Sequence, residues 1–221
     1  MKPSMSQDEF AQPDDKNYLC ALYSARYVFT IAGKMGIPGY EQYLRDGLSF
    51  DRLLDDQTGL YKTSEDMATE HWGRAKHPVQ LCPLTYLPMP ELDEAEKHAY
   101  DKRFFICSDM QKGIAHGWTL EAFCVADANM GQGEALYQDM QLAKSPLYSD
   151  PEEIMFYESS GQWDSAYFVT GHGFMLQAIL NAFVTDARGK TVLKGAVPQA
   201  WKGAEYFNLY TKDGVAHSGR C

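Results

Sequence analysis

The sequence predicts a mainly α-helical protein built from helical hairpins, with a small β patch at its C-terminus. Apolar residues recur every three to four positions through much of the chain between residues 17 and 184, which is the spacing of amphipathic helices. Glycines and prolines separate these stretches, as they do where helices end. After residue 189 the chain instead contains short runs that are typical of strands.

This periodicity predicts six helices, whose ends coincide with glycines, prolines and turn residues. Their approximate ranges are 17–31, 40–54, 93–112, 117–131, 134–144 and 172–184. Residues 55–61 are expected to form a turn and a short extended piece. The segment 63–90 is expected to be irregular, because its prolines lack an amide hydrogen and prevent a helix from continuing. The helix pairs suggest an array or toroid of hairpins.

Three regions are expected along the chain. Residues 1–16 are polar and acidic and are expected to form a flexible leader. Residues 17–189 are expected to form the helical domain. Residues 190–221 are expected to form a small β-rich segment, in which Lys212-Asp213-Gly214 is a hairpin turn signal.

Charge and hydropathy argue against two classes of partner. The net charge is −10 and no stripe of Lys and Arg is present, so we expect no nucleic acid partner. No apolar run approaches the roughly 20 residues that span a bilayer, so no membrane association is expected. The N-terminus lacks the apolar centre of a signal peptide. These features favour a cytoplasmic location.

The cysteines and histidines give no metal pattern. The five cysteines are scattered, without a CxxC pair, which favours reduced thiols over a zinc or thioredoxin-like site. The histidines show neither HxH nor HExxH spacing. We therefore expect neither a metal nor another cofactor. The cysteines are Cys20, Cys82, Cys107, Cys124 and Cys221.

One loop before the last predicted helix combines acids with an indole. Glu158 follows apolar residues, so partial desolvation could tune its pKa for general acid or base chemistry; it could equally be a solvated loop residue or a helix cap. Asp164 could cap the helix or hold a sugar hydroxyl, since paired carboxylates are the usual equipment for glycoside hydrolysis. Trp163 could stack on a sugar ring or fill the core.

Other polar and aromatic residues are candidates for ligand binding. His172 lies between two glycines at a helix start, where backbone amides can hold an oxygen-rich ligand, although the glycines could simply permit tight helix packing. Gln80 and Gln177 lie in apolar surroundings, and a buried amide needs partners, either in the protein or in a ligand. The remaining candidates are Trp72, His116 and Trp118.

The stretch ESSGQWDSAYFVTGHGFMLQAILNAF resembles the C-terminal core of the (α/α)6-barrel glycoside hydrolases and phosphorylases. This family includes maltose, trehalose and kojibiose phosphorylases and acid trehalase, and the hydrolase branch is the most similar. FVTGHGFMLQ matches the family phrase FLTGxGGFLQ, and Glu158 stands at its acid position. PVQLCPLTYLPMP resembles a sugar-gripping segment, with Gln80 at the family glutamine and Val79 in place of its lysine. AHGWTLEAF and PQAWKGAEYFNLY resemble its Trp-bearing helix and closing segment.

The resemblance implies a partial (α/α)6 barrel over residues 17–189 and inverting hydrolysis, with Glu158 as the general base that activates water. The family's phosphate-binding HxSSLS turn is replaced here by GIAHGWTL, which favours water over phosphate. Trp163 and Trp118 would be platforms, and Gln80 and His172 would hold hydroxyls.

The resemblance also implies a carbohydrate ligand and a second acid. The family's general acid lies upstream of the matched segment, so a partner chain or an N-terminal half barrel would supply it. The alternative is a non-catalytic carbohydrate-binding or helical scaffold domain that keeps the fold.

Overall fold

The computed structural model describes residues 16–48, 50–66, 79–85, 92–110, 116–152, 154–158 and 168–221. This part of the chain is mainly helical, with small antiparallel strand pairs, as predicted. Within it, no helix combines the length and apolar character needed to cross a membrane. The chain divides into two compact units, one made by residues up to Pro83 with Asp93–Gln111 and the other by Leu84–Leu92 with the chain from Lys112 onward.

The first unit is built around α1 (Leu19–Lys34) and α2 (Glu94–Met110), and both helices were predicted. Gly36 follows α1 with a φ of 72°, a left-handed conformation that a glycine adopts without strain and that stops the helix. The predicted turn after residue 55 joins β1 (Leu54–Asp55) to β2 (Leu60–Tyr61), which pair antiparallel.

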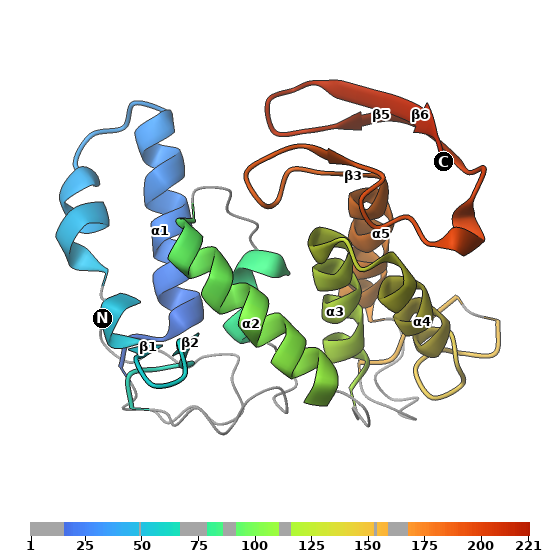
Figure 1. Ribbon diagram of the computed structural model, residues 1–221, viewed down its shortest axis with the longest axis horizontal. Coiled ribbons are helices and arrows are strands. Elements are labelled where there is room, and N and C mark those ends of the chain that lie inside the picture. Colours follow the sequence, from blue (N-terminus) through green and yellow to red (C-terminus); the bar gives the residue numbers. More distant parts are fainter. Residues whose placement is uncertain are drawn as a thin grey trace. The chain divides into compact units, whose positions relative to one another are not determined.

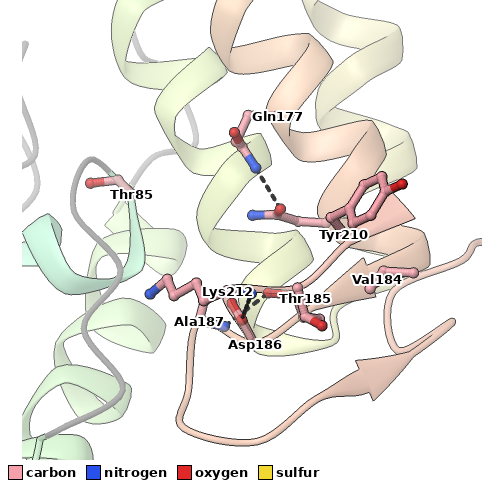
Figure 2. Close-up of a pocket in the computed structure, with 10 residues that line it drawn as sticks. Thr85, Gln177, Val184, Thr185, Asp186, Ala187, Tyr210 and Lys212 are labelled. Atoms are coloured by element: carbon pink, nitrogen blue, oxygen red, sulfur yellow. Dashed lines mark hydrogen bonds between the residues drawn. The ribbon is translucent and has the colours of Figure 1, made fainter. Parts of the chain in front are cut away.

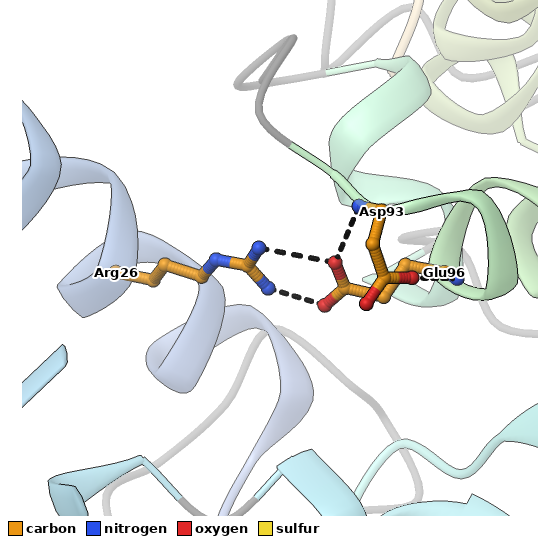
Figure 3. A network of polar contacts seen from close by, with 3 residues as sticks. All are labelled: Arg26, Asp93 and Glu96. Carbon is orange, nitrogen blue, oxygen red and sulfur yellow. Dashed lines mark hydrogen bonds and ion pairs between the residues drawn. The ribbon is translucent and has the colours of Figure 1, made fainter. Parts of the chain in front are cut away.

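The start of α2 is fixed by a reciprocal cap that also bonds to α1 (Figure 3). The Glu96 amide donates to Asp93 Oδ1 at 2.8 Å, and the Asp93 amide donates to Glu96 Oε2 at 3.0 Å. The Arg26 guanidinium donates to both oxygens of the same Glu96 carboxylate. Such a bidentate, charge-assisted pair is geometrically specific, so Glu96 both caps α2 and holds α1 against it.

The predicted helix over residues 40–54 is helical only in its first half, at residues 41–47, and does not continue to residue 54. Tyr43–Gly47 forms one π-helical turn, Phe50–Arg52 forms a 3-10 turn, and Leu54 already belongs to β1. Leu53 is fully buried, but Tyr43 is 47% exposed and Leu44 is 38% exposed. A helix that short needs a buried apolar face to be stable, and this stretch does not provide one.

The predicted irregular segment 63–90 lies largely outside the described residues. Its described part includes a 3-10 helix at Val79–Leu84, which has Pro83 inside it and non-helical dihedral angles at Leu81. The side chain of Gln80 is not among those that the structure describes.

The second unit is built on three helices, α3 (Gly117–Met130), α4 (Gly133–Ala143) and α5 (Val169–Phe183). The first two were predicted to within a residue or so, and α5 begins three residues before the predicted His172. α3 packs against both α4 and α5 (Figure 1) and is buried along almost its whole length. Gly131, with a φ of 73°, ends α3 and opens the tight turn into α4.

Two contacts show that α3 and α5 run parallel. Near their N-terminal ends, the Glu121 carboxyl lies directly against Gly171. Near their C-terminal ends, Asn181 Nδ2 donates to Asn129 Oδ1 at 2.9 Å. The order is the same in both helices, so they point the same way. A hairpin followed by a parallel third helix is the local arrangement that a hairpin array predicts.

The C-terminal β patch lies in the same unit and was also predicted, apart from β3. β3 (Val184–Thr185) pairs antiparallel with β4 (Val192–Leu193), and β5 (Glu205–Tyr210) pairs antiparallel with β6 (Ala216–Arg220). Gly214, at a φ of 81°, lies in the predicted turn between β5 and β6. Phe183 stacks on Trp201 with ring centroids 5.8 Å apart, and this cluster joins the patch to α5.

Candidate functional site

The segment 154–158, which carries Glu158, is anchored against the N-terminal ends of α3 and α5. The Trp118 amide donates to the Glu158 carbonyl at 3.3 Å, and the Phe168 amide donates to the Phe156 carbonyl at 3.2 Å. The Tyr157 amide donates to the Tyr148 carbonyl at 2.8 Å. These backbone bonds position the acid-bearing segment at the start of both parallel helices.

Gly117 makes this close approach feasible. A Cβ at this position would overlap the Tyr157 carbonyl oxygen. Any larger residue would therefore push the segment away from α3. This contact explains why α3, which is buried along almost its whole length, begins with glycine.

Glu158 and Trp118 are neighbours at this end of the unit. The Glu158 side chain is half-buried and so is the Trp118 indole. The indole packs against Phe174 of α5 and against Phe168, the residue before α5. Its ring centroid lies 5.3 Å from that of Phe174 and 5.4 Å from that of Phe168. The backbone of Glu158 therefore lies at the start of α3, the helix that carries the indole of this aromatic cluster.

His172 holds the segment in place through its ring nitrogens. Nε2 lies 2.7 Å from the Ile154 carbonyl and Nδ1 lies 3.2 Å from the Phe168 carbonyl. Its ring also lies against Phe156, with centroids 4.9 Å apart. Both nitrogens therefore lie near protein carbonyls, which ties the His172 side chain to Phe168 and to segment 154–158. His116 lies directly before α3 and is half-buried.

Glu121 is a feature of this region that the sequence reading missed. It is fully buried in the first turns of α3, against Gly171 and near Gly117. Neither of its oxygens has a hydrogen-bond partner among the described residues. Burial raises the pKa of the Glu121 carboxyl to about 8, so it is protonated at neutral pH. The sequence carried a signal, because the polar residues of α3 do not gather on one face, and such a helix buries its acids as well.

A second buried acid pair links α3 to α4. The carboxyls of Asp127 and Asp139 are hydrogen-bonded, and burial raises the pKa of both above the ordinary range of an aspartate. Two adjacent carboxyls in a buried place share a proton because they cannot both ionise. This pair joins the helices of the hairpin and lies on α3 two turns beyond Glu121.

The structure does not place the remaining candidate residues near Glu158. Trp72, Trp163 and Asp164 lie outside the described residues, and only the backbone of Gln80 is described. Gln177 lies on α5 and donates to Asn181 at 2.6 Å. No group of three or more His, Cys, Asp or Glu side chains within the described ranges is arranged to hold a metal ion.

Comparison of the chain with models of known protein families gives no match, and a search of curated proteins finds no relative at a significant level.

Proposed function

We propose that the chain is a glycoside hydrolase-type protein of the (α/α)6 toroid class that hydrolyses a glycosidic bond with inversion, using Glu158 as the general base. The observation that supports this most is the anchoring of segment 154–158 at the N-terminal ends of the parallel helices α3 and α5, beside Trp118. A toroid of hairpins brings all the inner-helix starts to one end, where loops can line a common cleft.

The chemistry of Glu158 suits the activation of water. In an inverting hydrolase the base removes a proton from a water that attacks the anomeric carbon, on the face opposite the leaving oxygen. Glu158 is half-exposed and can therefore meet both water and substrate. The neighbouring Trp118 supplies an apolar surface of the kind on which a sugar ring stacks.

We assign the second acid to a residue beyond those described, on the same chain or on a partner chain. Glu121 has the protonated state that a general acid needs, but its carboxyl oxygens are enclosed between the two helices. It cannot touch a leaving oxygen in this arrangement, so we give it a structural role.

The enclosure of Glu121 also favours one alternative. If no second acid reaches the Glu158 region, the unit would bind a carbohydrate without cleaving it. Trp118 and Glu158 would then serve only for recognition. The two candidates share a ligand class and differ in turnover, so one experiment can separate them.

The test measures turnover and binding on the same proteins. Wild type, Glu158→Gln and the control Glu41→Gln, which removes an exposed acid of the first unit, are assayed on a panel of aryl glycosides and disaccharides. We expect the Glu158 variant to lose about a hundredfold or more of kcat while its sugar affinity stays within a small factor, and the control to match wild type. The released sugar should first appear with inverted anomeric configuration in proton NMR spectra.

The other outcomes are equally informative. Sugar binding that depends on Trp118, with no turnover by wild type, would favour the non-catalytic alternative. Turnover that survives in Glu158→Gln would remove Glu158 from the base role. If wild type shows no turnover and binds no sugar, both candidates are contradicted.

A further inference from the structure

A polar cavity lies at the opposite end of the same helix pair, near the C-terminus of α5. It has a volume of about 300 Å³, which is at the small end of the range for ligand sites. Its walls come from α5, from β3 with the residues after it, from the end of β5 with the following turn, and from Thr85 (Figure 2). Glu158, Trp118 and the other residues at the helix starts do not line it.

The floor of the cavity is a hydrogen-bonded set of buried amide and hydroxyl groups. Asn181 Nδ2 and Thr185 Oγ1 donate to Asn129 Oδ1 at 2.9 and 3.0 Å. Asn129 Nδ2 in turn donates to the Leu84 carbonyl at 2.8 Å. Satisfied polar groups in a low-dielectric place are held rigidly, so this floor presents fixed donors and acceptors.

Hydrogen-bonding capacity remains on the groups that face the cavity. The Gln177 amide is oriented by its 2.6 Å bond to Asn181 Oδ1, and its carbonyl oxygen and second amide hydrogen are not engaged by the described residues. Asp186 Oδ2 accepts from the Lys212 amide at 2.7 Å, so its other oxygen is available to a ligand. Carboxamides and carboxylates placed this way match neighbouring hydroxyl groups, which both donate and accept.

Charge and shape narrow the class of ligand. The Asp186 carboxylate and the Lys212 ammonium, both in the lining, carry opposite charges, so the cavity favours a neutral molecule over an anion or a cation. Tyr210 is 70% exposed and also belongs to the lining. A tyrosine in this position offers a ring face to an apolar surface of the ligand and a hydroxyl to its polar edge.

We infer that this cavity binds a single pyranose-sized polyol, either a free monosaccharide or the terminal unit of a longer glycan. Gln177 and Asp186 take its hydroxyls, and Tyr210 packs on its ring. The site is separate from Glu158 and holds its ligand without chemistry. It therefore stands or falls independently of the hydrolase function proposed above.

The test uses the full chain with defined probes in ligand-observed NMR and calorimetry. The probes are glucose, galactose, mannose and myo-inositol for the free form, maltose and maltotriose for the terminal form, and adenosine as a non-polyol of similar size. We expect saturable binding of at least one polyol, weakened about tenfold by Gln177→Leu, since 1.4 kcal/mol corresponds to a factor of 10. Tyr210→Ala should weaken it as well.

Three controls keep the outcome decisive. Gln138→Leu makes the same change at an exposed site on α4 and should leave affinity unchanged. Gln177 and Tyr210 are both exposed, so we expect their variants to fold. Thermal unfolding of each variant checks that weaker binding is not caused by loss of the fold. Glu158→Gln should not change binding here, whatever it does to hydrolysis.

The source of the ligand follows from which probes bind. Monosaccharides that bind as well as their oligomers indicate a free sugar, and oligomers that bind more tightly indicate a glycan end. Affinity that is unchanged in both Gln177→Leu and Tyr210→Ala, preferential binding of adenosine, or no saturable binding of any polyol would overturn the inference.

Discussion

The two ends of the α3–α5 pair differ in whether their buried polar groups have hydrogen-bond partners. At the N-terminal end, Glu121 is enclosed with no hydrogen-bond partner among the described residues and stays protonated. At the C-terminal end, Asn129 bonds to Asn181, Thr185 and the Leu84 carbonyl. The same helix contact is therefore held by apolar and glycine packing at one end and by a polar network at the other.

This difference determines which substitutions each end of the helix pair tolerates. A partnerless acid can be replaced by a neutral side chain at little loss, because nothing depends on its bonds. A residue that satisfies several buried groups cannot be replaced so easily, since its removal leaves each of them unpaired. The predictions below change one end at a time.

The largest effect is expected at the polar end. Asn129→Leu removes the partner of Asn181, Thr185 and the Leu84 carbonyl, and each buried group left unpaired costs about 1–3 kcal/mol. We expect the free energy of unfolding in urea to fall by about 4 kcal/mol in total. Gln138→Leu, at an exposed position on α4, is the matched control, and an equal loss in both variants would show that the network contributes little.

The next effect is expected at the glycine-packed end. Gly117→Ala places a methyl group on the Tyr157 carbonyl, and overpacking of this kind costs about 1–3 kcal/mol. It should also displace Glu158 and reduce any activity that depends on it. Gly173→Ala, where nothing lies within 4 Å of the added Cβ, should instead stabilise the protein by up to about 1 kcal/mol. Similar stabilities for the two variants would contradict the close approach at Gly117.

The third effect depends on pH. A carboxyl with a raised pKa in the folded state makes stability fall as pH increases, because the unfolded chain releases the proton first. For Glu121 the window runs from its ordinary pKa of 4.5 to about 8. The stability of Glu121→Gln relative to wild type should therefore increase with pH by at most about 1.4 kcal/mol per pH unit in this window, and should be constant above it.

Chemical denaturation at a series of pH values measures this difference directly. The raised pKa values of Asp127 and Asp139 also make stability fall as pH increases. The Glu121 variant should therefore retain part of the pH dependence of wild type. A difference that does not vary with pH would mean that Glu121 is ionised or solvated in the folded protein.

The sequence predicted most of the helices because each lies between clear stop signals. Gly131 and Gly133 bracket the α3–α4 turn, and Gly36 follows α1. The prediction for residues 40–54 did not hold over the whole stretch. The apolar residues there have helical spacing, but most of the side chains are exposed, and only the tertiary structure decides which side chains are buried. The parallel course of α3 and α5 was not predicted, and the residues that form the contact were not predictable from local patterns.

The candidate site was predictable only in part. Glu158 and Trp118 were singled out from their neighbours in the sequence, and the structure places their backbones in contact. The partner of Gln177 lies four residues on, at a spacing that puts two side chains on one helix face. The partner of Asn181 is Asn129, 52 residues away, and no local pattern indicates such a pair.

The junction at Glu96 has a consequence for how the first unit opens. One carboxylate closes the first turn of α2 and receives the guanidinium from the middle of α1. The fraying of one helix and the release of the other are therefore a single event. Amide hydrogens at the start of α2 and around Arg26 should exchange with deuterium at a common rate, and Glu96→Gln should accelerate both together.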